Sequence, residues 1–130
     1  MDDKKTLGLN HEVHSFVEAL VSSWKWFPDQ QSAGRFCFAY ALVRQQSADA
    51  MQDVDDAPRT TVWNVGTIDS DGTMRQLLAI LGVSEEASYR MVEDLMNLGA
   101  TLLQKRLSDN PSVGLWDIIR EQQGEGPSPQ

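Results

Sequence analysis

An uninterrupted apolar run constrains the fold of this chain more than any other feature. The run extends over eight residues, from Phe36 to Val43, and stands between Arg35 and Arg44. Because it is apolar on every side, it is stable only when other elements surround it. Its alanines favour a helix over about residues 32–46, although its aromatic side chains are also compatible with a strand. We therefore predict that this run forms the centre of a folded core.

Apolar side chains recur at helical spacing in further segments of the chain. We predict helices over about residues 11–25, over 71–81, from Ser84 onward as the longest helix, and from Asn110 onward as the last one. Gly99 lies inside the longest helix, where glycine costs about 1 kcal/mol relative to alanine. Either another helix crosses closely at Gly99, or the helix breaks there.

These segments predict an all-α fold, a compact bundle of about five helices. Residues 60–68 gather β-branched and aromatic side chains and are compatible with one short strand. Such a strand needs a pairing partner, which is another copy of the chain, a different protein, or an extended segment such as 7–9. We expect a flexible lead-in over 1–9, a single helical domain over 10–123 and a flexible tail over 124–130. The predicted core combines apolar side chains of all these helices: Phe16, Leu20, Phe36, Phe38, Leu42, Leu77, Leu81, Val92, Leu95, Leu103 and Trp116.

The charge balance disfavours direct contact with polyanions. The chain has 19 acidic and 11 basic residues, a formal net charge of −8, and its arginines are spread almost evenly along the sequence. A protein that binds duplex DNA neutralises phosphates with clustered lysines and arginines, and anionic membranes attract the same kind of cluster. We therefore expect no direct nucleic-acid binding and no membrane binding as the main role.

The single cysteine, Cys37, excludes an intramolecular disulfide and a zinc site built from cysteines alone. No stretch approaches the roughly 18 apolar residues of a membrane span. The N-terminus lacks the apolar stretch of a secretory signal. These features predict a cytoplasmic protein.

His11, His14 and Glu18 are the best metal-ligand candidates in the sequence. On a helix they fall within about 60° of one another, as a metal site requires. The face that they share lies opposite the apolar stripe of Phe16 and Leu20, so it points to solvent. The alternatives are a solvated polar face with a His14–Glu18 pair, and a metal shared with a partner.

The other candidate residues for catalysis or metal binding are better explained by structural roles. Cys37 sits inside the apolar run, where a thiol is unreactive. The stretch Asp69-Ser-Asp-Gly resembles only the opening of a calcium loop, and a capped turn is the favoured interpretation. We find no phosphate-binding glycine loop and no nucleophile elbow in the sequence. We therefore expect a non-enzymatic protein with no catalytic residues and no cofactor.

Large aromatic side chains outside the helical stripes are the candidates for partner binding. Trp26, Phe27, Trp63 and the neighbouring Val65 form this group. Two interpretations are open, because such residues are either core plugs or anchors at an interface, where tryptophan is enriched. We expect a protein partner or a second copy of the chain.

The order of four segments resembles a known family. These are the aromatic-alanine run 36–42, the β-like segment around Trp63, the Leu77-Leu-Ala-Ile-Leu segment and the Asn97-Leu-Gly-Ala segment. Together they resemble the small helical accessory proteins encoded beside bacterial phosphorothioate DNA-modification systems, the Dnd-type defence islands. The resemblance covers roughly residues 33–104. It implies an accessory subunit that acts through protein contacts in a DNA-modification or antiphage complex, and it implies no site residues.

Two alternative functions remain open. A strand over 60–68 followed by two helices has the order of a ribbon-helix-helix dimer, which reads DNA with paired strands. Residues 60–68 contain no Lys or Arg, so this order is better suited to dimerisation than to reading DNA. The second alternative is a small metal-dependent enzyme built on His11, His14 and Glu18.

Overall fold

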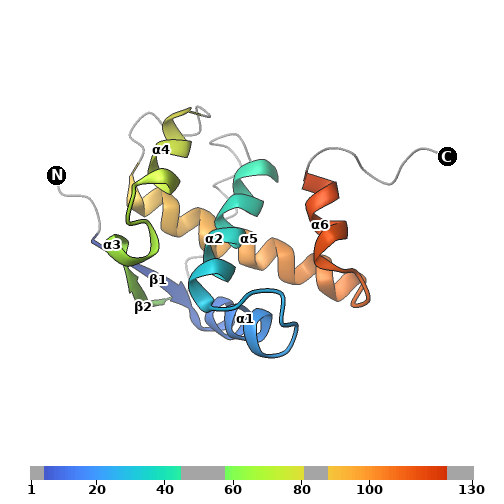
Figure 1. Ribbon diagram of the computed structural model, residues 1–130. Helices are drawn as coiled ribbons and strands as arrows, with labels where there is room; N and C mark the ends of the chain where they lie inside the picture. The colour runs from blue at the N-terminus through green and yellow to red at the C-terminus, as the bar shows by residue number, and fades with distance from the viewer. Residues whose placement is uncertain (1–4, 45–57, 81–87, 123–130) are drawn as a thin grey trace.

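The computed structural model describes residues 5–44, 58–80 and 88–122, and this part of the chain is mostly helical (Figure 1). It contains six helices and one antiparallel sheet of two strands. The elements follow one another as β1 (Thr6–Asn10), α1 (His11–Ser22), α2 (Gln30–Arg44), β2 (Arg59–Asn64), α3 (Val65–Ile68), α4 (Thr73–Ile80), α5 (Tyr89–Asp109) and α6 (Leu115–Gln122). None of the described helices combines the length and the apolar character that a membrane crossing requires.

The apolar run lies in α2, which crosses the longest helix, α5. Cys37, Phe38 and Ala41 on α2 are fully buried, so the expected core centre is confirmed. The crossing point is Gly99, where a Cβ atom would collide with the carbonyl oxygen of Cys37. The first of the two explanations for this glycine is therefore correct: α5 continues unbroken, and α2 approaches it too closely for a side chain.

β1 corrects the expectation of a flexible lead-in over 1–9. Residues 6–10 form a strand that pairs antiparallel with β2, and Leu7 and Leu9 are buried in the core. The extended segment at 7–9 is thus the partner of β2, as one of the three alternatives proposed. The two strands lie side by side in Figure 1, below α2 and next to α1. Residues 1–4 and the expected tail over 124–130 lie outside the described residues.

The strand predicted over 60–68 ends at Asn64. Beyond this point β1 offers no further paired residue, and the last backbone hydrogen bond to it runs from the Val65 N–H to the Lys5 carbonyl, at 3.0 Å. The chain then turns through the short helix α3. The Asp69 side chain accepts hydrogen bonds from the Met74 N–H at 3.0 Å and the Tyr89 hydroxyl at 3.0 Å, which confirms a capped turn in front of α4.

Two helices begin later in the chain than the sequence predicted, and a third begins where it was predicted. Asn10 caps α1 as predicted and accepts a hydrogen bond from the Val13 N–H at 2.8 Å. α5 begins at Tyr89 and not near Ser84, because Ser88 is extended and its hydroxyl caps the helix. α6 begins at Leu115, since the residues after Asn110 form a turn. Ser84 itself lies outside the described residues.

Most of the predicted core is buried, with one clear exception. Phe16, Leu20, Phe38, Leu42, Val92, Leu95 and Leu103 are buried, and Phe36 and Leu77 are partly buried against them. Trp116 is 72% exposed, so its assignment to the core is wrong. The apolar side of α6 is instead the side of the fully buried Ile118, which lies about 200° around the helix from Trp116. Leu81 lies outside the described residues.

Candidate functional site

The connection between α1 and α2 holds three large aromatic residues in a fixed turn. Backbone hydrogen bonds tie it to the end of α1: the Trp24 N–H donates to the Ala19 carbonyl at 2.8 Å, and the Trp26 N–H donates to the Leu20 carbonyl at 3.0 Å. Lys25 between them adopts the left-handed conformation, with φ 58°. The turn therefore presents Trp24, Trp26 and Phe27 from a defined backbone.

The aromatic side chains contact one another in two groups. The rings of Trp24 and Trp26 meet edge to face, with centroids 5.3 Å apart. Phe27 packs on Phe36 of α2 at 5.3 Å, and Phe36 in turn stacks near Tyr40 at 6.3 Å. Such pairs add about 0.5–1.5 kcal/mol to the burial of their area. All but Tyr40 are only partly buried, so they contribute both to the core and to the surface.

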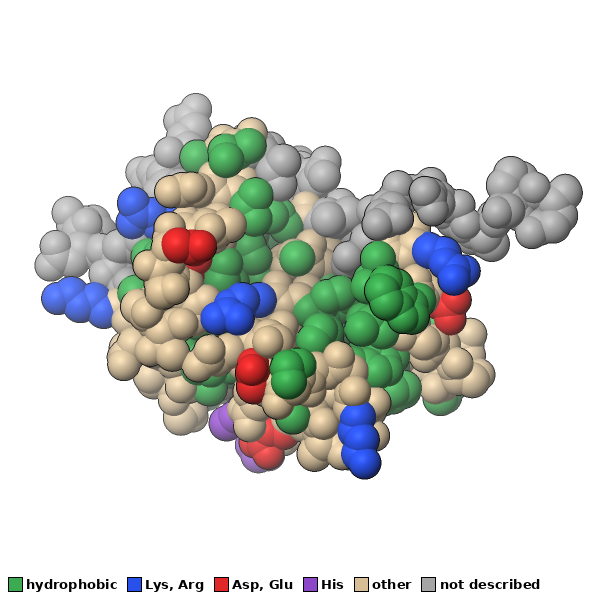
Figure 2. All heavy atoms as spheres, viewed as in Figure 1, with side chains coloured by type: hydrophobic (Ala, Val, Ile, Leu, Met, Phe, Trp, Pro, Cys, Tyr) green, Lys and Arg blue, Asp and Glu red, His purple; other side chains and the backbone are tan. Residues whose placement is uncertain are grey.

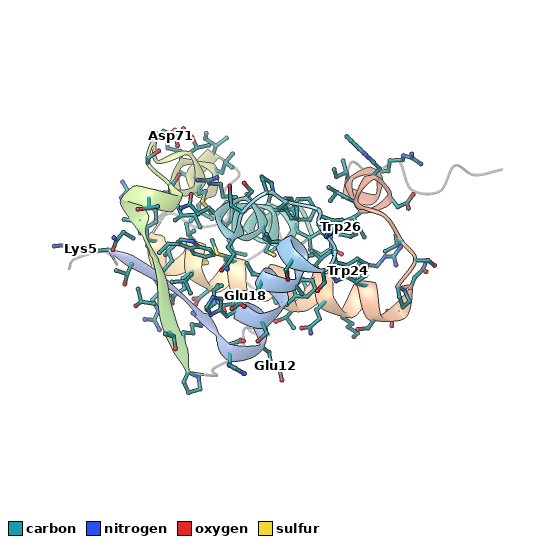
Figure 3. All side chains as sticks on the ribbon, turned by 60° about the horizontal axis from the view of Figure 1, so that its bottom comes forward. Lys5, Glu12, Glu18, Trp24, Trp26 and Asp71 are labelled. Atoms are coloured by element: carbon teal, nitrogen blue, oxygen red, sulfur yellow. The ribbon has the colours of Figure 1, made fainter. Side chains whose placement is uncertain are left out.

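Helix α6 carries a further tryptophan, Trp116, which is 72% exposed. Figure 2 shows hydrophobic side chains gathered where α6 faces the connection between α1 and α2. Figure 3 shows Trp24 and Trp26 between α1 and α6. Trp116 extends from the outer side of α6. We call Trp24, Trp26, Phe27, Phe36 and Trp116 the aromatic surface.

An open hollow of about 750 Å³ adjoins the aromatic surface at Trp24. Its walls come from α1 and from the C-terminal part of α5 with the turn that follows. The lining residues are His11, Glu12, Ser15, Phe16, Ala19, Trp24, Gln104, Leu107, Ser108 and Pro111. A hollow lined by both apolar and polar side chains is suited to accept a side chain of a partner.

The three metal-ligand candidates do not form one cluster. His14 and Glu18 make an i,i+4 pair, with 3.4 Å between Nε2 and Oε1. His11, at the start of α1, is one of the residues that line the hollow. Within the described ranges, no group of three or more His, Cys, Asp or Glu side chains is arranged to hold a metal ion.

Cys37 is fully buried under the crossing of α2 and α5. Burial raises the pKa of its thiol to about 12, because the thiolate is not solvated there. The thiol is therefore protonated and unreactive at neutral pH. This confirms that Cys37 packs in the core.

Trp63 and Val65 lie on β2 and α3, apart from the connection that carries Trp26 and Phe27. The Trp63 ring lies over Gly34, where a Cβ atom would come within 2.8 Å of the ring. Trp63 is only 8% exposed, which favours the core plug over the partner anchor among its two open interpretations. Val65 is partly buried against the same core.

Sequence reasoning missed a buried polar network between the sheet and α5. The Arg59 guanidinium at the start of β2 donates to Glu93 at 2.8 Å and to Asp94 at 2.6 Å. Burial lowers the pKa of Arg59, but the hydrogen bonds to the two carboxylates outweigh this effect and raise it above its ordinary value. The one available signal was that Glu93 and Asn97, four residues apart, share one face of the predicted helix.

The same network holds β1 in place. Glu93 Oε2 accepts a hydrogen bond from the Gly8 N–H at 2.8 Å. Asn97 accepts from the Asn10 N–H at 3.0 Å and donates to the Gly8 carbonyl at 3.0 Å. These side chains satisfy the backbone hydrogen-bonding groups on the edge of β1 that faces away from β2. The hydrogen bonds of the network therefore hold β1 in place.

The chain matches no protein-family model, no curated protein and no solved structure in comparisons with known proteins. Its function is therefore argued from its own residues.

Proposed function

We propose that this protein is a non-enzymatic binding module that engages a protein partner through its aromatic surface. The observation that carries the proposal is Trp116, a tryptophan that is 72% exposed on α6, the helix beside which Figure 3 shows Trp24 and Trp26. Tryptophan is a frequent binding anchor, because it buries a large rigid area at a small cost in conformational entropy. The partly buried Trp24–Trp26 pair, on the connection between α1 and α2, provides a preformed apolar support.

The resemblance over residues 33–104 suggests the setting in which this module acts. We propose a small helical-bundle subunit of a cytoplasmic DNA-modification or antiphage complex, in contact with a protein component of that complex. The formal net charge of −8 supports contact with a protein and not with the DNA itself.

Capture of partners from a native lysate tests the proposal. We expect the wild-type chain to retain a defined protein, and the Trp116→Ser variant to lose it. Ile80→Ser is the matched control, because Ile80 is an equally exposed apolar residue, at 73%, on a different helix. Both variants should keep the stability of the wild type to within about 0.5 kcal/mol, since exposed substitutions cost little.

The comparison between the variants decides the outcome. If Trp116→Ser retains the same protein as the wild type, the aromatic surface is not the binding site. If Ile80→Ser loses it as well, the capture reflects general hydrophobic adhesion and not a specific surface.

A further inference from the structure

The hollow between α1 and the C-terminal part of α5 is long enough to hold a segment of chain. Its lining residues on α1 run from His11 through Ser15 to Ala19, a rise of about 12 Å along the helix, and Trp24 follows beyond them. Four or five residues of extended peptide cover about 13–17 Å. The hollow is therefore a groove that matches a short peptide segment, and we call it the α1–α5 groove.

The wall of the α1–α5 groove that α1 provides is negatively charged. Glu12, in the first turn of α1, is exposed and lines the groove. None of the lining residues is a lysine or an arginine, and α1 itself contains neither. With histidine counted as neutral, Glu12 is thus the one charged side chain of the lining.

The opposite wall is the C-terminal end of α5, which is the negative end of the helix dipole. Leu107, Ser108 and Pro111 line the groove there. Pro111 has no N–H, so it cannot donate to the Leu107 carbonyl four residues earlier. The Ser112 N–H, the helical donor for the Ser108 carbonyl, donates to the Asn110 side chain at 3.3 Å. Carbonyl groups at this end therefore lack their helical donors, and this wall attracts cations as well.

The cations of this part of α5 lie on its other sides. Around the helix, Lys105 and Arg106 are about 110° and 150° away from the centre of the lining residues Gln104, Leu107 and Ser108. They therefore do not place a positive charge in the groove.

Trp24 ends the α1–α5 groove with an aromatic ring. The Trp24 N–H donates to the Ala19 carbonyl at 2.8 Å, and the ring meets Trp26 edge to face, so its position is fixed. The face of a tryptophan ring attracts guanidinium and ammonium groups. The groove thus combines a carboxylate, the carbonyl end of a helix and an indole ring, each of which attracts a cation.

We propose that the α1–α5 groove holds a short basic segment of the protein partner, with one arginine at Trp24 and a second at Glu12. Two side chains are required, because Glu12 and Trp24 stand too far apart along α1 for one guanidinium to contact both. Guanidinium suits these sites better than ammonium, since its planar group stacks on an indole ring and pairs with a carboxylate through two hydrogen bonds. The net charge of −8 attracts such a segment toward the chain. This inference rests on the proposed function, because it names the chemistry of the partner that the adjoining aromatic surface engages.

A peptide titration of the full chain tests the proposal. The probe is the peptide Arg-Ala-Ala-Ala-Arg with blocked ends, in which the two arginines are about 13 Å apart when the peptide is extended. The matched control replaces both arginines with citrulline, which has a similar shape and no charge. Binding is followed by NMR at the backbone amides of Ala19, Gln104 and Ser108, which belong to residues of the groove. We expect a dissociation constant of about 0.1–1 mM for the arginine peptide and binding at least about fivefold weaker for the citrulline peptide. Equal binding of the two peptides, or shifts confined to residues outside the groove, would overturn the proposal.

A pair of variants tests the position of the segment. Glu12→Gln removes one charge from the groove and should weaken binding of the arginine peptide at least about threefold. Glu18→Gln makes the same change at an exposed position of α1 outside the lining, and it should bind like the wild type. Both positions are exposed, so both variants should fold normally. Equal affinities of the two variants would show that the peptide responds to overall charge and not to the groove.

Failure of this inference is distinguishable from failure of the proposed function. A protein that is captured by the wild type and lost by Trp116→Ser, together with a groove that does not respond to the arginine peptide, would overturn the basic segment alone. If Trp116→Ser retains the captured protein while the groove still binds the arginine peptide, the aromatic surface is not the binding site, and the groove remains a site for basic segments.

Discussion

Gly99 decides how closely the two longest helices approach. A Cβ atom at this position would collide with the Cys37 carbonyl oxygen and would also come within 3.1 Å of the Ala41 side chain. The collision involves backbone, so it cannot be relieved by rotation of a side chain. Helix propensity alone would favour alanine by about 1 kcal/mol, and the presence of glycine shows that the close crossing outweighs propensity.

The Gly99→Ala variant tests this argument. We expect it to lower the free energy of unfolding by about 1–3 kcal/mol, because the two helices must separate to admit the methyl group. Urea denaturation followed by circular dichroism measures the change. Gly66→Ala is the matched control, since Gly66 lies in a helix and has open space around its Cβ position. A Gly99→Ala protein as stable as the control would show that the crossing tolerates a side chain.

Trp116 and Trp63 show at the residue scale why composition did not separate surface from core. Trp116 was assigned to the core, and it is exposed; Trp63 was a candidate surface anchor, and it is buried. Both positions depend on contacts distant in sequence. Trp63 is buried because Gly34 leaves space for its ring, and Trp116 is exposed because Ile118 takes the inner face of α6. Neither fact is visible from the local pattern around the tryptophan.

At the scale of elements, β1 depends on side chains of α5 as much as on β2. Asn97 alone provides an acceptor for the Asn10 N–H and a donor for the Gly8 carbonyl, and it is almost fully buried. A two-stranded sheet is marginal by itself in water. The polar contacts from α5 therefore help to explain why so short a sheet persists.

The Asn97→Ala variant should loosen β1. It leaves the Asn10 N–H and the Gly8 carbonyl without these partners in a buried site, which costs about 1–3 kcal/mol. We expect faster hydrogen exchange at the Asn10 amide, together with a lower free energy of unfolding. Gln104→Ala, an exposed change seven residues further along α5, should leave the exchange at Asn10 unaltered. Unchanged exchange in Asn97→Ala would mean that β1 is held by β2 and the core alone.

The helices were predictable from the sequence, and the sheet only in part. The apolar periodicity of residues 11–25 and the N-cap at Asn10 are local signals, so α1 was found close to its observed bounds. The partner of β2 was left as three alternatives, because strand pairing joins residues 49 to 58 positions apart. Glu93 contacts Gly8 across 85 positions, and no periodic pattern reports such a contact.

At the scale of the whole molecule, the sequence predicted only some of the residues of the candidate site. Trp26 and Phe27 were selected because they fall outside the helical stripes, and the structure places them partly exposed in one fixed turn. Phe36 and Trp116, which also belong to the aromatic surface, were assigned to the core. Amphipathic periodicity predicts which residues share a face of a helix, but it does not say which face finds a partner within the same chain.

Net charge is the property of the whole molecule that separates a protein-binding role from a ribbon-helix-helix DNA reader. One arginine, Arg59, belongs to β2, and its guanidinium is bound to two carboxylates of α5. The remainder of the strand is uncharged, and the chain as a whole carries −8. Even a dimer paired through β2 would therefore offer DNA no cluster of cations on these strands, and phosphate neutralisation is the main source of affinity for duplexes.

We therefore expect no binding of duplex DNA in a mobility-shift titration at physiological salt. At low salt the affinity should remain weak as well, because few counterions are released when few phosphates are neutralised. A basic protein of similar size serves as the positive control for the titration. Tight binding whose affinity falls steeply with added salt would contradict this expectation, and it would mean that cations on other elements, or a bound partner, provide the phosphate contacts that β2 lacks.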